Sequence, residues 1–199
     1  MGITSINKII NKAKQIGLMQ IDKEFIPFLS YIKDLNLINF LEIGTSLGGA
    51  FYALSQVIGG KAISIDLPNG TFGGIPLENM GKRNAILKKE CKNTYFLAEN
   101  SQNLDTVKRV ESILKNEKLD LCFIDGDHTY PGVLLDFLLY KNLVKENGLI
   151  VFHDIKNTER HKSLNCNVSI LWNQLKGKKK EFVDDLVDWG GIGIISIIK

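Results

Sequence analysis

Short apolar runs alternate along the chain with longer segments in which apolar residues recur every three or four positions. This alternation predicts strands separated by helices, which is the pattern of a parallel sheet. The runs interpreted as strands cover residues 38–43, 61–67, 95–98, 119–124, 149–152, 181–187 and 192–198. The predicted helices cover residues 6–16, 23–35, 47–58, 78–91, 104–116, 133–145 and 167–175.

The last two predicted strands have no helix between them. A tight turn around Gly190 and Gly191 joins them, so we expect them to be antiparallel to each other. The other runs are almost continuously apolar, which is typical of parallel strands that are buried on both faces. The pattern therefore predicts an α/β protein with seven strands.

Length and composition narrow the class of protein. The 199 residues suffice for one core but are few for two domains. A net charge of +3 is too small to indicate a nucleic-acid partner, and no apolar run is long enough to span a membrane. Three widely spaced cysteines without a C-x-x-C pair fit a reducing compartment, so we expect a cytoplasmic protein.

Unusual polar residues fall where predicted strands end. They are Glu42, Asp66, Asn100, Asp125 and Asp154. In open α/β sheets, ligands bind outside the carboxyl ends of the strands. One such carboxylate alone would be interpreted as a helix cap or a solvated charge, but four at successive strand ends indicate a ligand site.

The turn after the first predicted strand reads EIGTSLGG. A dinucleotide fingerprint needs glycine where Ser46 stands, and Glu42 would repel a pyrophosphate but suit a cation. A turn in which Gly44 and Gly48 only permit strand–helix packing is an equal alternative. Asp66, 22 residues after Gly44 (66 − 44), suits ribose hydroxyls. Together these features fit S-adenosylmethionine, a nucleoside with a cationic sulfur and no pyrophosphate.

These motifs resemble those of class I S-adenosylmethionine-dependent methyltransferases. FLEIGTSLGGAFYAL resembles their glycine motif and AISIDLP their acidic motif, and the likeness continues through LAENSQN, FIDGDHTYPGVLLDF, ENGLIVFHDI and WGGIGIISI. The resemblance implies a doubly wound, Rossmann-like seven-stranded sheet, mostly parallel with an antiparallel last strand. It also implies that Asn100, Ser101 and Gln102 lie by the adenine, although Glu99-Asn100 stands where many relatives have Gly-Asp.

The fourth and fifth predicted strands end in groups that suit acid–base or metal chemistry. Neighbouring strand ends lie about 4.8 Å apart, so Asp125 and Asp154 are placed to share Mg²⁺ or another divalent cation. Such an ion lowers the pKa of a hydroxyl acceptor, and His128 is placed to take the proton. The segment DGDHTY at residues 125–130 resembles that of metal-dependent sugar O-methyltransferases of the macrocin-type and cephalosporin-hydroxylase-like group, which implies that Asp125 binds metal and His128 is the base. At the end of the fifth predicted strand, His153 stands where metal-dependent relatives commonly have a carboxylate, and imidazole is a poor Mg²⁺ ligand.

The sequence therefore predicts an S-adenosylmethionine-dependent O-methyltransferase whose acceptor is a small hydroxylated molecule, such as a sugar or a polysaccharide or natural-product precursor. The predicted cofactor residues are Glu42, Gly44, Ser46, Gly48, Asp66, Asn100, Ser101, Gln102 and Asp125. His128 is the predicted catalytic residue, and Asp125 and Asp154 are the predicted metal ligands. Two alternatives remain open: a dinucleotide-dependent oxidoreductase, and a protein that binds S-adenosylmethionine without transferring its methyl group.

The rest of the chain carries weaker signals. Residues 1–35 are predicted to be two helices that cover the acceptor site or form a homodimer contact, and residues 36–199 the methyltransferase domain. Phe72, in the glycine-rich loop 68–76, suits a lid or a plain exposed loop equally. His161 lies in a polar loop, so we expect it to be solvated.

Overall fold

The computed structural model describes residues 3–196, and side chains from Ile6 on. One seven-stranded sheet forms the centre of the protein, in the order β3-β2-β1-β4-β5-β7-β6. Its strands are β1 (Phe40–Ile43), β2 (Ala62–Ile65), β3 (Thr94–Leu97), β4 (Leu119–Ile124), β5 (Val144–His153), β6 (Lys179–Phe182) and β7 (Ile192–Ser196). Strands β1 to β5 are parallel, and β7 is antiparallel to both of its neighbours. The predicted fold class is confirmed.

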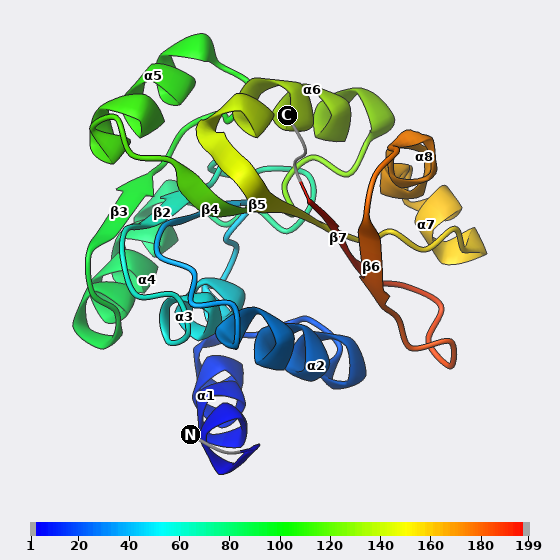
Figure 1. The fold of residues 1–199 in the computed structure, drawn as a ribbon, viewed down its shortest axis with the longest axis horizontal. Coiled ribbons are helices and arrows are strands. Elements are labelled where there is room, and N and C mark those ends of the chain that lie inside the picture. The colour runs from blue at the N-terminus through cyan, green and yellow to red at the C-terminus, as the bar shows by residue number, and fades with distance from the viewer. Residues whose placement is uncertain (1–2, 197–199) are drawn as a thin grey trace.

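Helices cover both faces of the sheet (Figure 1). They are α1 (Ile3–Ile16), α2 (Asp22–Lys33), α3 (Gly49–Ser55), α4 (Leu77–Glu90), α5 (Leu104–Leu114), α6 (Tyr130–Tyr140), the 3-10 helix η1 (Lys141–Leu143), α7 (Glu159–Ser163) and α8 (Val168–Gln174). Side chains of α1 to α4 enter one hydrophobic core, and those of α5, α6 and α8 enter a second core on the opposite face. This is the doubly wound arrangement, because both faces of the parallel strands are buried.

The N-terminal helices α1 and α2 share their core with β1 and α3. Phe28 of α2 is fully buried, and its ring packs at a tilt against Phe123 of β4, with centroids 5.8 Å apart. Between the two helices the chain passes directly over the β1–α3 turn: a Cβ atom added at Gly49 would lie 2.1 Å from the Leu18 nitrogen. The helices are therefore built into the domain. Whether they also contact a second copy of the chain stays a prediction.

Two predicted boundaries near the sheet edge are wrong. The sixth strand covers Lys179–Phe182 and not 181–187, and residues 183–191 form a long loop where a tight turn was predicted. Lys180 is exposed at the sheet edge, where a lysine charge remains solvated; its ammonium lies 4.8 Å from the centre of the Tyr31 ring. The seventh strand agrees with the prediction as far as Ser196, and residues 197–198 lie outside the described residues.

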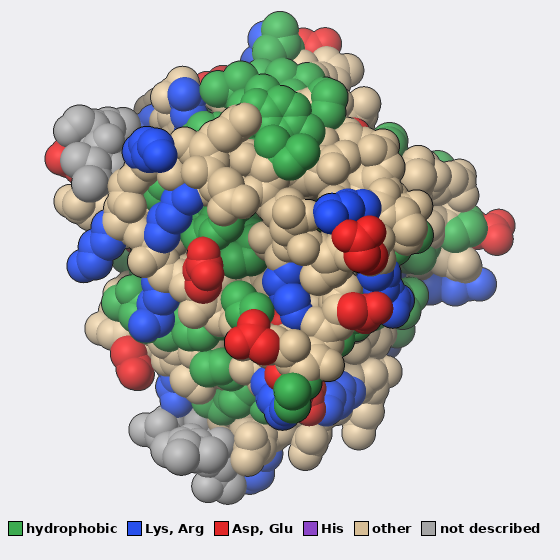
Figure 2. Space-filling view, turned by 90° about the vertical axis from the view of Figure 1, so that its right-hand side faces the viewer, with side chains coloured by type: hydrophobic (Ala, Val, Ile, Leu, Met, Phe, Trp, Pro, Cys, Tyr) green, Lys and Arg blue, Asp and Glu red, His purple; other side chains and the backbone are tan. Residues whose placement is uncertain are grey.

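The helix predicted over 133–145 also ends earlier than expected. Helix α6 ends at Tyr140, and Val144 already pairs with Leu119 in the sheet. No helix within residues 3–196 is long and apolar enough to cross a membrane. On the face shown in Figure 2, lysine and arginine side chains are interspersed with aspartate and glutamate.

Candidate active site

The carboxyl ends of the central strands lie at one level. Ile43 pairs with Ile65 and with Ile124, and Ile124 pairs with Phe152. The residues that follow these strands therefore gather at one edge, where two cavities adjoin. Both cavities are lined by Gly44, Asp66, Thr71, Phe72 and Leu164.

The turn after β1 brings two backbones into contact. Gly44 has φ +85°, and a Cβ atom there would lie 2.1 Å from the Asp125 carbonyl oxygen. Only glycine fits this position without moving β1 from β4. Ser46 also has positive φ (46°), and its hydroxyl donates to the Gly73 carbonyl at 2.8 Å. Gly44 and Ser46 line the first cavity, whereas Gly48 lines neither cavity.

Asp66, the predicted ribose ligand, stands at the boundary between the two cavities. Its carboxylate pairs with the buried guanidinium of Arg83 from α4, which also donates to the Ser46 carbonyl at 2.7 Å. Burial raises the pKa of Asp66, and Arg83 together with the Thr45 and Ser46 amides opposes that rise. The sequence analysis did not identify Arg83, which ties α4 to both predicted cofactor motifs.

Glu42 is placed differently from its predicted role. It is fully buried, lines neither cavity, and neither carboxyl oxygen has a hydrogen-bond partner. Because side chains alternate along a strand, Glu42 shares the face of Phe40, which packs on Phe51 of α3. Burial raises the pKa of Glu42 well above its usual value; the Thr45 side chain opposes this and Asp125 adds to it. A cation-binding role for Glu42 stays a prediction.

The second cavity is lined by the predicted adenine residues Asn100, Ser101 and Gln102. Beneath them Ser101 donates its hydroxyl to Asp136 at 2.7 Å, and the Tyr140 hydroxyl donates to the Ser101 carbonyl at 2.7 Å. Burial raises the pKa of Asp136 to about 7, with Ser101 opposing the shift. Helix α6 thus fixes the backbone of this wall from below.

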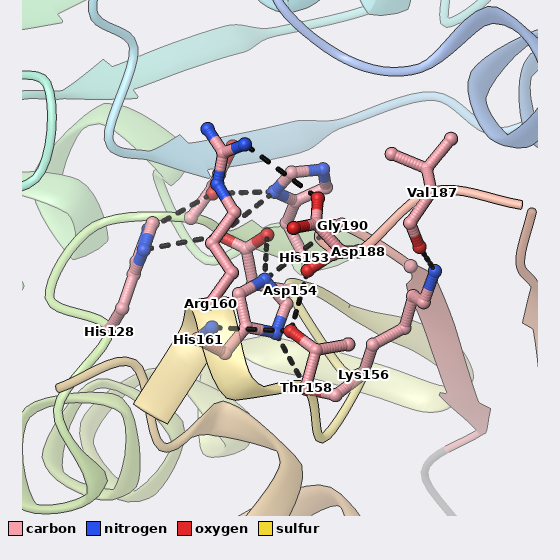
Figure 3. Close-up of polar contacts among 12 residues, drawn as sticks. His128, His153, Asp154, Lys156, Thr158, Arg160, His161, Val187, Asp188 and Gly190 are labelled. Atoms are coloured by element: carbon pink, nitrogen blue, oxygen red, sulfur yellow. Dashed lines mark hydrogen bonds and ion pairs between the residues drawn. The ribbon is translucent and has the colours of Figure 1, made fainter. Parts of the chain in front are cut away.

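The first cavity contains a cluster of imidazoles and carboxylates. His128 contacts Asp154 through Nδ1 (3.1 Å to Oδ2) and Asp125 through Nε2 (3.2 Å to Oδ1). His153 Nδ1 lies 3.2 Å from Asp125 Oδ1 and 3.4 Å from Asp154 Oδ2. Figure 3 shows His128 and His153 reaching Asp154 from opposite sides. The structure therefore brings together every residue predicted for catalysis or metal binding.

The expectation that His161 is solvated is wrong. Its ring is buried, and Nδ1 lies 2.6 Å from the Lys156 carbonyl while Nε2 accepts the Gly190 amide at 3.1 Å (Figure 3). Its Nε2 also lies 3.2 Å from Asp154 Oδ1. The short helix α7 carries His161 back toward the sheet, and no hydrophobic periodicity marked that helix in the sequence.

Two further residues of the cluster were not identified from the sequence. Cys166, in the loop before α8, lines the first cavity with only 5% of its surface exposed. Gln20, between α1 and α2, donates from Nε2 to Asp125 at 3.1 Å. A polar residue at a helix junction and a lone cysteine carry no sequence signal that separates them from ordinary positions.

The carboxylates control the protonation of the cluster. Burial alone would lower the pKa of His128, but contacts with Asp125, Cys166 and Asp154 outweigh it and raise the pKa to about 10. His153 has its pKa raised for the same reason. In the structure as it stands, both rings therefore favour the charged form near neutral pH.

Comparison with known proteins identifies the family. The profile of a methyltransferase domain family matches residues 41–155, more than half of the chain. The chain belongs to this methyltransferase family. An uncharacterised protein of Acanthamoeba polyphaga mimivirus is 32% identical over 129 residues, which are 60% of this chain and 52% of that protein. The chain thus spans about half the length of that curated relative.

Solved methyltransferase structures share the fold. A putative O-methyltransferase from Klebsiella pneumoniae superposes with a TM-score of 0.64 at 13% identity, covering 100% of this chain and 92% of that one. An O-methyltransferase from Bacillus cereus in complex with SAH gives a TM-score of 0.60 at 16% identity, with the same coverage of 100% and 92%. At such identities the likeness establishes the fold alone.

The donor set of this methyltransferase does not fit the predicted Mg²⁺. Mg²⁺ prefers oxygen ligands in an octahedral arrangement and keeps several water molecules. Asp125 Oδ1 and Asp154 Oδ2, which the sequence assigns to the ion, each lie within 3.4 Å of two imidazole nitrogens. Imidazole nitrogens therefore already contact the carboxylate oxygens that were predicted to bind the ion.

Trp189, which lines the first cavity, is carried by the 183–191 loop. Glu24 of α2 is fully buried and accepts the amides of Asp184 (2.9 Å) and Gly191 (2.8 Å). From the other side, Lys156 donates to the Asp184 carbonyl at 2.8 Å, and the Arg160 guanidinium lies 5.8 Å from the Trp189 ring. The methyltransferase thus holds its cavity wall through one buried carboxylate and one lysine.

Proposed function

We propose that this methyltransferase transfers a methyl group from S-adenosylmethionine to a hydroxyl oxygen of a small acceptor. The observation that carries the proposal is the division of the carboxyl edge at Asp66. Amide and hydroxyl side chains of residues 100–102 line the cavity on one side, and His128 lines the cavity on the other. A nucleoside whose ribose meets Asp66 would extend into both cavities.

The residues present fit that cofactor. Asp66 is the acidic group that ribose hydroxyls require, and Arg83 holds it in place. Gly44 lines both cavities, and the absence of a side chain there allows the turn to lie against the Asp125 carbonyl. The Bacillus cereus O-methyltransferase was solved with SAH, the demethylated cofactor, on the same fold.

His128 has the geometry of a proton acceptor. Its Nδ1 faces the Asp154 carboxylate at 3.1 Å, which orients the ring, and its buried Nε2 makes no hydrogen bond, although Asp125 Oδ1 lies 3.2 Å away. A hydroxyl that attacks a methyl group must lose its proton, and an imidazole nitrogen within reach is the usual acceptor. When bound, S-adenosylmethionine supplies the methyl group on a positively charged sulfur, and this charge lowers the pKa of a neighbouring imidazolium.

The acceptor would occupy the remaining part of the first cavity. Its walls are mostly apolar, with Met19, Leu47, Phe72 and Trp189, and Arg160 at the side. The Phe72 ring stacks on His128 with centroids 4.6 Å apart and an interplanar angle of 26°, so an acceptor that reaches Nε2 must displace or slide beneath it. These walls accept the apolar face of a ring with hydroxyl groups, and a sugar remains the predicted acceptor.

Thermal unfolding with S-adenosylhomocysteine, NAD and NADP tests the cofactor. A ligand at about 100 times its Kd adds roughly 2.7 kcal/mol to stability, which for a chain of this length raises Tm by roughly 5–10 °C. We expect the shift with S-adenosylhomocysteine only. Asn100→Ala should reduce the shift, whereas Asn142→Ala, at an exposed position outside both cavities, should not. A shift with NAD or NADP alone would refute the proposal in favour of an oxidoreductase.

Methyl transfer is tested with S-adenosylmethionine and a panel of sugars and phenols, by detecting S-adenosylhomocysteine as product. We expect a sugar hydroxyl to be methylated, and His128→Ala to lose transfer while keeping the thermal shift. Full turnover by His128→Ala would refute the proposed base. A thermal shift with no transfer to any acceptor would instead support a binding protein without transfer activity.

A further inference from the structure

Three residues of the first cavity form a mixed nitrogen, oxygen and sulfur donor set. They are His128 from the loop after β4, Asp154 at the end of β5 and Cys166 from the loop before α8. One ligand atom from each lies within 4.8 Å of the other two, and all three residues line the first cavity. Asp154 and Cys166 are 7% and 5% exposed, so the donors are shielded from bulk water.

Buried polar atoms in this set lack partners. His128 Nε2 and Asp154 Oδ1 make no hydrogen bond, although each has a polar atom at 3.2 Å. The neighbour of Asp154 Oδ1 is His161 Nε2, which already accepts the Gly190 amide and thus has no proton to offer as a neutral ring. A buried polar atom without a partner costs about 1–3 kcal/mol. A cation that displaces the His128 proton and binds at either atom would remove this cost.

The backbone holds the three donors in place before any ion binds. The Asn167 amide donates to the His128 carbonyl at 2.7 Å, and the Cys166 amide donates to the His161 carbonyl at 2.8 Å. Asp154 itself has φ +60°, in the left-handed region that aspartate enters more readily than most residues. These bonds fix the 128 loop against the 165–167 segment, so little ordering remains to oppose ion binding.

We propose that His128, Asp154 and Cys166 bind Zn²⁺ or a transition-metal ion of similar character. Thiolate and imidazole are ligands that Zn²⁺ prefers, and three protein ligands leave a fourth position open in a tetrahedral site. The same set suits Mg²⁺ poorly, because Mg²⁺ requires oxygen ligands. The predicted divalent cation is thus replaced by a softer ion, displaced from the Asp125–Asp154 pair toward Cys166.

Occupancy of this site has a consequence that rests on the proposed function. An imidazole that donates its lone pair to a metal ion while its other nitrogen faces a carboxylate has none left for the proton of an acceptor hydroxyl. Metal binding and proton acceptance by His128 are therefore mutually exclusive. The ion would act as an inhibitor of the methyltransferase.

Cobalt substitution tests the site on the full chain, stripped of metal with a chelator. Co²⁺ bound by a thiolate absorbs in the near ultraviolet through charge transfer from sulfur. We expect this band to appear at one equivalent of Co²⁺, to be removed by Zn²⁺, and to resist excess Mg²⁺. Cys166→Ser should abolish the band and weaken Zn²⁺ binding by at least about 100-fold, because loss of even an outer-shell partner costs about 10–100-fold. Cys91→Ser, which alters another buried cysteine, should bind as the unmodified chain does.

His153→Gln separates this site from the neighbouring trio of Asp125, His153 and Asp154, whose ligand atoms also lie within 4.8 Å. We expect His153→Gln to keep the sulfur band. Binding that survives Cys166→Ser at full strength, or that Mg²⁺ displaces equally well, would overturn the proposal. The thermal shift with S-adenosylhomocysteine is measured on the same metal-free chain, so failure of the metal site and failure of the proposed function are observed separately.

Discussion

Replacing Asp136 by asparagine should change how stability depends on pH. Asp136 has no exposed surface; its Oδ1 accepts the Ser101 hydroxyl at 2.7 Å, and its Oδ2 has no partner. Burial raises the pKa of this carboxyl to about 7 from the usual 3.8, although the Ser101 hydroxyl opposes the rise and Asp127 adds to it. The folded protein therefore holds the Asp136 proton more tightly than the unfolded chain does.

The sign and the size of the effect follow from linkage. Because the folded pKa is raised, the stability contributed by the bound proton is complete below about pH 3.8 and is lost as the pH rises to about 7. Each pH unit between the two pKa values corresponds to about 1.4 kcal/mol. Ionisation of Asp136 thus costs the folded state at most about 4 kcal/mol, on the order of 10 °C in Tm.

Urea unfolding of Asp136→Asn and the unmodified chain, at about pH 5 and about pH 8, measures this cost. Asparagine keeps an acceptor for Ser101 but does not ionise, so the variant should gain about 3 kcal/mol relative to the unmodified chain between the two pH values. Asp185→Asn removes an exposed carboxylate and serves as the control. If Asp136→Asn and the unmodified chain change in parallel with pH, the carboxyl is not held neutral by burial and the reasoning fails.

Two further predictions concern close contacts around the site. Gly44→Ala should destabilise the protein by more than about 3 kcal/mol in urea unfolding, since it combines positive φ with a Cβ 2.1 Å from the Asp125 carbonyl. The matched Gly81→Ala, in α4 with no atom within 4 Å, should gain about 0.5–1 kcal/mol, and equal effects would contradict the role of the close approach. Glu24→Gln should lower stability by about 2 kcal/mol, because one buried backbone amide then faces an NH₂ group; an unchanged Tm would show that Glu24 does not hold the 183–191 loop.

Much of the edge that carries the site could be predicted from the sequence. Apolar runs that stop at Asp66, Asp125 and His153-Asp154 mark strand ends, and parallel strands in a common register bring those ends together. The loop position of His128, three residues after Asp125, placed it in the same cluster. Local pattern suffices for these residues because the sheet itself supplies the tertiary contact.

The other residues of the site depend on tertiary contacts that the local sequence pattern does not encode. All four residues of β1 are buried, so the strand shows no alternation of polar and apolar residues. The sequence therefore does not indicate that Glu42 faces α3 and not the cavity. Arg83 reaches Asp66 across a loop and a helix, and His161 is buried by a five-residue helix that polar composition concealed. Such residues are recognised only when their partners are placed in space.

The two amide bonds accepted by Glu24 also bear on how the protein folds. They join residues 160 and 167 positions apart in the chain. Contacts of such separation are slow to form, because a large loop must close before they contribute. During synthesis α2 leaves the ribosome long before residues 184–191 exist, and its buried carboxylate has no amides to bind until then. The part of the cavity that Trp189 lines can therefore close only at the end of synthesis, and a chain that stops before residue 189 would leave that side of the cavity open.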